Sequence, residues 1–145
     1  MSDLLLISSQ PLDILSAYAH VVQPDCGAVA SFIGTTRDNF NHKEVLYLEY
    51  EAYEPMALKE MEKICVFLHA EYSVSRVSMS HRVGRVNVSE PSVVIFVSSS
   101  HRQQALEAVS KAIDMVKETV PIWKKEWYKD GSVWKGSAQC CQKKS

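Results

Sequence analysis

Hydrophobic and polar residues follow two different periods along this chain of 145 residues. Short apolar runs and strict alternation predict strands, whereas apolar residues three or four positions apart predict helices. The predicted strands cover residues 4–8, 28–33, 45–53, 74–80 and 93–97. The predicted helices cover residues 11–22, 55–72 and 100–117.

The same pattern predicts which face of each element is buried. Strand 45–53 is expected to bury Leu46, Leu48, Tyr50 and Ala52, with Glu49 and Glu51 on a solvated or interface face. The core stripe of helix 55–72 should contain Ala57, Met61, Ile64, Cys65 and Leu68. The core stripe of helix 100–117 should contain Leu106, Val109, Ile113 and either Val116 or Val120.

The end of helix 100–117 is the first place where chemistry is suggested. Pro121 cannot continue the helix, so Lys117 lies on its last turn and Lys124 lies just beyond a forced exit. Two ammonium groups beside Ile122 and Trp123 could bind an anion, and desolvation could lower the pKa of a lysine. Alternatively, both lysines are solvated and one is favoured by the helix dipole.

The start of the same helix carries two more basic residues. Ser100 and Gln103 fit a capping box, and His101 and Arg102 fall in the first turn. Cations are disfavoured at a helix N-terminus unless an anion is bound there, so the pair suggests a phosphate site. The helix is about 25 Å long, so His101 and Lys117 of one chain cannot share a small ligand. Either the site combines two subunits of a homodimer, or the two ends serve different functions.

Two other segments are rich in polar or basic residues. The strand ending at Gly34 runs into Thr35, Thr36 and Arg37, which could place a guanidinium and backbone N–H groups around one anion. A plain loop with a solvated arginine is the alternative. A basic group after strand 74–80, formed by His81, Arg82 and Arg85, is expected at the surface or at an interface, and contact with a substrate is the less favoured alternative.

Composition limits the remaining classes of function. The formal net charge of −1 provides no global attraction for nucleic acid or an anionic membrane. The apolar run at residues 4–7 is too short for a signal-peptide core or a membrane span, so a cytosolic protein is expected. The four cysteines form no Cys-x-x-Cys pair and no zinc-site spacing, which predicts free thiols, no metal and no cofactor. The Asp130-Gly131 pair predicts a C-terminal hairpin, followed by a flexible tail over residues 135–145.

Several motifs together resemble one known family. They are Gly34-Thr35-Thr36-Arg37, the Glu-Tyr-Glu-Ala-Tyr strand at 49–53, His81-Arg82-Val83-Gly84, Ser100-His101-Arg102 and the segment from Val120 to Glu126. In this order they resemble the large, catalytic subunits of molybdopterin synthase. The amino-acid sequence of the 49–53 strand is similar to that of the eukaryotic-type members. The resemblance covers about residues 27–134.

The resemblance implies a fold, a reaction and partners. The fold would be an α/β-hammerhead of α+β type, with a mixed or antiparallel sheet, packed helices and one catalytic domain over residues 1–134. The reaction would convert cyclic pyranopterin monophosphate (precursor Z) to molybdopterin by two sulfur transfers, in molybdenum cofactor biosynthesis. A small ubiquitin-like sulfur-carrier subunit, with a thiocarboxylated Gly-Gly tail, would flank a homodimer on each side in a heterotetramer.

The resemblance also implies roles for residues already singled out. The catalytic positions would be Lys117, beside the carrier tail, and Lys124. The substrate-binding positions would be Thr35, Thr36, Arg37, His101, Arg102, Lys117, Lys124, Lys125 and Glu126. Some bacterial relatives have an arginine shortly after the tryptophan that matches Trp134, and Lys135 is the nearest basic residue here.

Two other functions are compatible with the residues alone. The first is a non-catalytic dimeric module that binds a phosphorylated metabolite through Arg37, His101 and Arg102. The second is an enzyme that forms a Schiff base through Lys117. A role in nucleic-acid binding is the least supported, because no stripe of aromatic and basic residues accompanies the near-neutral charge.

Overall fold

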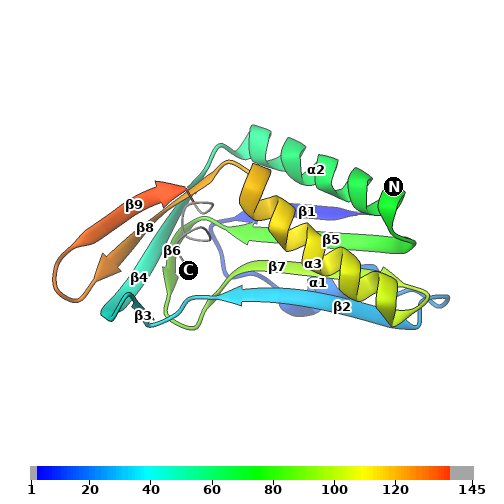
Figure 1. Cartoon of the computed structure of the whole chain (residues 1–145), viewed down its shortest axis with the longest axis horizontal. Helices are drawn as coiled ribbons and strands as arrows, with labels where there is room; N and C mark the ends of the chain where they lie inside the picture. The colour runs from blue at the N-terminus through cyan, green and yellow to red at the C-terminus, as the bar shows by residue number, and fades with distance from the viewer. Residues whose placement is uncertain (1–2, 138–145) are drawn as a thin grey trace.

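Two β-sheets meet at an angle in the computed structural model, which describes residues 3–137 (Figure 1). The first sheet has the strand order β1-β5-β7-β2 and the second the order β3-β4-β8-β9, with β6 paired to β4. The first sheet contains β1 (Leu4–Ser8), β2 (Ala28–Thr35), β5 (Val74–Arg82) and β7 (Pro91–Ser99). The second sheet contains β3 (Asn39–Phe40), β4 (Lys43–Ala52), β6 (Gly84–Asn87), β8 (Ile122–Tyr128) and β9 (Val133–Ser137).

The helices cover both faces of the first sheet. Helices α2 (Glu54–Glu71) and α3 (Arg102–Thr119) lie on one face, and the short α1 (Ile14–Val21) packs against β5 and β7 on the other (Figure 1). Strands β1 and β5 are parallel while the other pairs of this sheet are antiparallel. The sequence-based expectation of an α+β protein with a mixed sheet, packed helices and a C-terminal hairpin is therefore confirmed.

One buried cluster joins the two sheets. It contains Val77, Met79 and Ile95 from the first sheet, and Leu48 and Ile122 from the second. The helix α2 contributes the stripe that its sequence predicted, and all five of those residues are buried. Since the buried side chains form a continuous core, the junction of the two sheets is held in a fixed geometry.

Two predicted faces differ from the structure by one position. Leu46 is 47% exposed, and Val45 is buried in its place, because the pairing of β4 with β8 shifts register between Val45 and Tyr47. In α3, Leu106 is 57% exposed, and the buried stripe consists mainly of small residues, namely Ala105, Ala108, Val109, Ala112 and Val116. Alanines let α3 approach the sheet closely. The prediction did not include them because it relied on large apolar side chains.

The ends of two elements also differ from prediction. The N-cap of α3 is His101, with no side-chain hydrogen bond, so the capping box of Ser100 and Gln103 is wrong. The hairpin forms as predicted, with Gly131 at φ +89°, a value that glycine adopts readily. Its return strand continues through Ser137, three residues beyond the predicted boundary at Trp134. The rest of the predicted tail, including Cys140 and Cys141, lies outside the described residues.

None of the helices in residues 3–137 is both long and apolar enough to cross a membrane.

Candidate functional site

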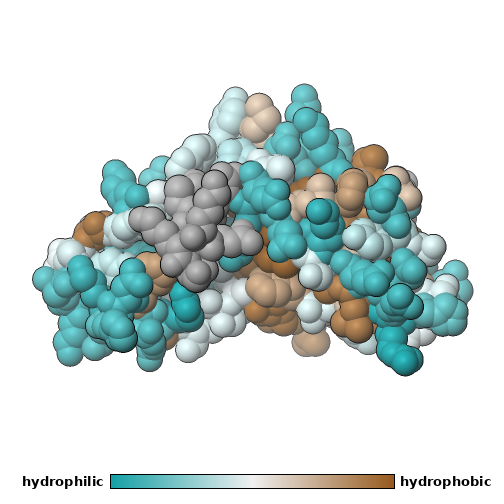
Figure 2. Space-filling view, viewed as in Figure 1, coloured by the Kyte–Doolittle hydropathy of each residue, from teal (hydrophilic) through white to brown (hydrophobic). Residues whose placement is uncertain are grey.

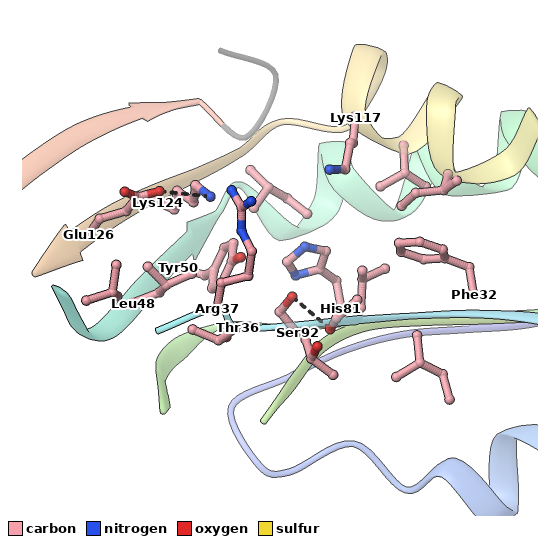
Figure 3. Close-up of a pocket in the computed structure, with 18 of the residues that line it drawn as sticks. Phe32, Thr36, Arg37, Leu48, Tyr50, His81, Ser92, Lys117, Lys124 and Glu126 are labelled. Carbon is pink, nitrogen blue, oxygen red and sulfur yellow. Dashed lines mark hydrogen bonds and ion pairs between the residues drawn. The ribbon is translucent and has the colours of Figure 1, made fainter. Parts of the chain in front are cut away.

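A cavity of about 430 Å³ opens where the two sheets and the end of α3 meet. Its apolar wall includes Phe32 from β2 and Ile113 and Val116 from α3. Its polar lining includes Thr36 and Arg37 from the segment after β2, His81 from β5, Lys117 from α3, and Lys124 and Glu126 from β8. The cavity therefore collects residues from β2 and the segment that follows it, from β5, from α3 and from β8, which are far apart in sequence (Figure 3).

The exit from α3 at Pro121 brings the two lysines to the same cavity. Lys117 lies in the last turn of the helix, and Val120 closes it by donating its N–H to the Val116 carbonyl at 3.1 Å. Strand β8 then begins at Ile122, and its alternation turns Lys124 and Glu126 toward the cavity. Figure 3 shows Lys117 pointing into the space above His81, with Lys124 on the opposite side.

Glu126 is the acid that fixes the position of Lys124. It is 4% exposed, and its Oε2 lies 3.1 Å from the Lys124 Nζ. The hydroxyl of Tyr128 donates a short hydrogen bond to the other carboxylate oxygen. Because an ion pair shielded from water is held more tightly than an exposed one, the ammonium of Lys124 has a defined place in the cavity.

Arg37 adds a third cation at the mouth of the cavity. Its side chain is exposed, and its guanidinium carbon lies 5.8 Å from the centre of the Phe40 ring. Thr36 is buried, and its N–H and hydroxyl both lie within hydrogen-bond distance of the Glu90 carbonyl, at 3.2 and 3.4 Å. Thr36 therefore holds the loop that presents Arg37, and its N–H is already engaged within the protein.

His81 lies inside this cavity, although its sequence context favoured the surface or an interface over contact with a substrate. It is 5% exposed because β5 extends to Arg82, two residues beyond the predicted strand. The prediction was wrong for this residue, whereas Arg85 is exposed and stacks 3.8 Å above the Tyr47 ring. Side chains alternate between the two faces of a strand, and Val77 and Met79 face the core. If the predicted strand had been extended to residue 82, the same alternation would have placed His81 on the buried face.

Three predicted site residues lie elsewhere in the chain. His101 and Arg102 are exposed at the start of α3, the opposite end of the helix from Lys117. Lys125 faces the other side of β8, where it pairs with Glu49 on β4 and with Lys135 on β9. Within one chain, the cavity thus contains Thr35, Thr36, Arg37, Lys117, Lys124 and Glu126 of the predicted set.

The cavity carries a net positive charge beside an apolar wall. Arg37, Lys117 and Lys124 supply three positive groups, and the carboxylate of Glu126 offsets one of them. Such a lining can hold an anionic group and stabilise negative charge that develops during a reaction. The lining fits a ligand that combines an anionic group with apolar surface better than a purely apolar one.

Comparison with known proteins identifies the family. The family described as MoaE protein matches residues 7–119. The chain belongs to the MoaE family. The human molybdopterin synthase catalytic subunit is 48% identical over 138 residues, which cover 95% of this chain and 73% of the human protein.

Solved structures of similar proteins agree with this assignment. The crystal structure of molybdopterin synthase from Staphylococcus aureus superposes with a TM-score of 0.86 at 35% identity, covering 90% of this chain and 95% of that one. A complex of subunits 1 and 2 of molybdopterin-converting factor from Helicobacter pylori shares the fold, with a TM-score of 0.72 at 23% identity. That match covers 96% of this chain and 91% of the Helicobacter chain.

Proposed function

We propose that this member of the MoaE family is the catalytic subunit of a molybdopterin synthase. It is a sulfurtransferase that converts cyclic pyranopterin monophosphate to molybdopterin, with two sulfurs supplied by the thiocarboxylated tail of a small carrier subunit. The observation that carries the proposal is the meeting of Arg37, Lys117 and Lys124 around one cavity with an apolar wall. This chemistry suits a flat pterin that bears a cyclic phosphate.

The two lysines have different surroundings, which supports different roles. Lys117 extends from the end of a helix toward the open part of the cavity, where it neutralises the terminal anion of the carrier tail and acts as acid or base. Lys124 is held by Glu126 at 3.1 Å and stabilises the charge that develops on a leaving oxygen.

We expect the nucleophile to come from the carrier, since no cysteine of residues 3–137 lines the cavity. Cys65 is 3% exposed in the core, and burial raises the pKa of its thiol to about 12. A buried, protonated thiol is a poor nucleophile. The thiocarboxylate of the carrier enters the cavity already activated, so the lysines have only to orient it and to neutralise charge.

The site is completed by a second copy of the chain. His101 and Arg102 lie about 20 Å or more from Lys117 along α3, so they contribute to the cavity of the partner in a homodimer. Figure 2 shows apolar side chains over the middle of the face that contains β2, an edge strand on which Ile33 is 37% exposed. An apolar edge of this kind is suited to a subunit contact.

The proposed assembly is a heterotetramer in which a carrier flanks each subunit of the homodimer. The Helicobacter pylori protein of the same fold was solved as a complex of two different subunits, which supports a small-subunit partner here. We infer that the enzyme acts in the cytosol, because Cys26 and Cys65 are free thiols, as expected in a reducing compartment.

Reconstitution tests the function. Purified protein is mixed with cyclic pyranopterin monophosphate and a thiocarboxylated carrier, and the dithiolene pterin is quantified. We expect product from the native chain. Tight pterin binding without product, from a carrier shown to be charged, would instead support a binding module. Trapping of Lys117 by borohydride with a carbonyl substrate would support a Schiff-base enzyme.

A further inference from the structure

His81 forms part of the floor of the cavity, and no role follows for it from the sulfur-transfer chemistry described above. It lies next to last in β5, opposite Val93 of β7, on the same side of the strand as the buried Val77 and Met79. Figure 3 shows its imidazole between Tyr50 and Lys117, in the space toward which Arg37 also points. The ring is therefore a polar group placed at the centre of the site.

Two contacts fix the tautomer and the orientation of this ring. Its Nδ1 lies 2.8 Å from the Arg82 carbonyl oxygen. Because a carbonyl can only accept, Nδ1 carries the hydrogen, and Nε2 of the neutral ring is an acceptor. The Tyr50 ring packs edge-on at 5.0 Å with an interplanar angle of 71°, which holds the plane of the imidazole.

The surroundings keep the ring uncharged. Burial lowers the pKa of His81 to about 4, the Arg82 carbonyl opposes that shift, and repulsion from Lys117 and Lys124 adds to it. At neutral pH the imidazole therefore presents a lone pair at Nε2, on a ring that lines the cavity.

The other charged groups that face the ring have a different hydrogen-bonding character. Arg37, Lys117 and Lys124 only donate, and the Glu126 carboxylate is engaged by Lys124 and Tyr128. An anionic group of a ligand suits the three cations. A neutral N–H or O–H of the same ligand needs an acceptor, and Nε2 of His81 provides one in the floor of the cavity.

We propose that His81 determines substrate specificity: its Nε2 accepts a hydrogen bond from an N–H or O–H of the bound heterocycle, while Arg37 and the two lysines hold the anionic group. The inference rests on the proposed function for the identity of the substrate. It predicts that the cavity discriminates against analogues that lack the donor, because a buried acceptor left without a partner costs binding free energy.

Two substitutions separate this role from a structural one. His81→Asn keeps an amide N–H near the position of Nδ1, and so keeps the bond to the Arg82 carbonyl, but it removes the acceptor at Nε2. His81→Gln places an amide oxygen near Nε2 and loses the donor to Arg82. We expect His81→Asn to raise the Kd of cyclic pyranopterin monophosphate about tenfold, and His81→Gln to raise it much less.

The opposite order would overturn the proposal. A structural role predicts that His81→Asn binds like the native protein and that His81→Gln is the weaker variant. Thermal melting of both variants checks that each is folded. If either variant is unfolded, the ¹⁵N chemical shift of Nε2 in the native protein tests the hydrogen bond directly. The resonance of an acceptor nitrogen moves upfield when the substrate donates a hydrogen bond to it. An unchanged resonance at saturating substrate would contradict the proposal.

The pH dependence provides a second discriminating result. The ratio of the Kd values of His81→Asn and native protein should stay constant from about pH 6 to 8, since the imidazole titrates well below this range. A ratio that changes near the ordinary histidine pKa would mean that an imidazolium makes the contact, which is contrary to the proposal.

These measurements need no carrier, so they are separate from the test of sulfur transfer. Equal pterin affinities for native protein, His81→Asn and His81→Gln, together with normal product formation by the native chain, would refute only the role of His81. Failure of the native chain to form product would refute the proposed function, whereas the contrast between the Asn and Gln variants would still report on Nε2.

Discussion

The two ends of α3 carry cationic residues in opposite environments. At the C-terminal end, Lys117 is partly buried beside the cavity, and Lys124 and Glu126 of the next strand lie close by. At the N-terminal end, His101 and Arg102 are exposed, and the N-cap makes no side-chain hydrogen bond. A single chain brings the two lysines of the proposed site to one cavity, whereas His101 and Arg102, the proposed phosphate-binding pair, face outward.

The contrast has a physical consequence for assembly. A helix N-terminus attracts anions through its free N–H groups and its dipole, and the Arg102 guanidinium is disfavoured in that position unless an anion is bound. An exposed pair gains little from such a ligand, because water screens the interaction. Placed over the cavity of a partner subunit, the same pair would act on the anion that Arg37 holds.

The largest effect is expected at the C-terminal end of the helix. Lys117→Ala should reduce turnover by about 10³-fold or more, because it removes the group proposed to neutralise the terminal anion of the carrier tail and to act as acid or base. Lys111→Ala is the matched control on the same helix, since Lys111 lies 5.9 Å from the Phe67 ring, away from the cavity. Single-turnover product formation measures both variants, and equal losses would contradict a specific role for Lys117.

A smaller effect, on affinity, is expected at the N-terminal end. Arg102→Ala should raise the Kd of the phosphorylated pterin about tenfold to a hundredfold, the range for a charge-assisted hydrogen bond. Turnover at saturating substrate should change much less. Calorimetric titration with the pterin measures the affinity. An unchanged Kd would show that this end of the helix serves another purpose.

The buried ion pair gives a third comparison, within β8. Glu126→Gln keeps an acceptor for the Tyr128 hydroxyl but removes the counter-ion of Lys124, so we expect turnover to fall about tenfold. Tyr128→Phe keeps the ion pair and loses one hydrogen bond, which should cost about 1 kcal/mol of unfolding free energy with little change in turnover. Denaturant unfolding and steady-state rates together test the pair. Equal turnover in both variants would argue against a role for Glu126 in holding Lys124.

Much of this arrangement could be predicted from the sequence, because it depends on local signals. Pro121 predicted where α3 ends, and the Asp130-Gly131 pair predicted the hairpin that follows β8. The parts that were missed depend on how elements pack. Val109 and Val116 were predicted on the buried face of α3, but the alanines Ala105, Ala108 and Ala112 were missed, because small residues there allow a close approach to the sheet.

His81 and Leu46 were misplaced for related reasons. The position of His81 follows from the length of β5, and element boundaries are the least certain part of a sequence pattern. Leu46 is exposed because of an irregularity in strand pairing, which has no signature in the alternation itself. Likewise, the predicted helix length indicated that His101 and Lys117 could not share a small ligand within one subunit, but it did not indicate which surfaces of two subunits would meet.

The most direct test of the central claim is a mixing experiment between two inactive variants. Lys117→Ala and Arg102→Glu proteins, each inactive alone at low substrate concentration, are unfolded together, refolded and assayed with the carrier. If each site combines the two ends of α3 from different subunits, random pairing should restore about a quarter of native sites, because half of the pockets in each mixed dimer are intact. Recovery to this level would support the shared site. No recovery, from a mixture shown to contain mixed dimers, would place both ends of α3 in functions of a single chain and contradict the account.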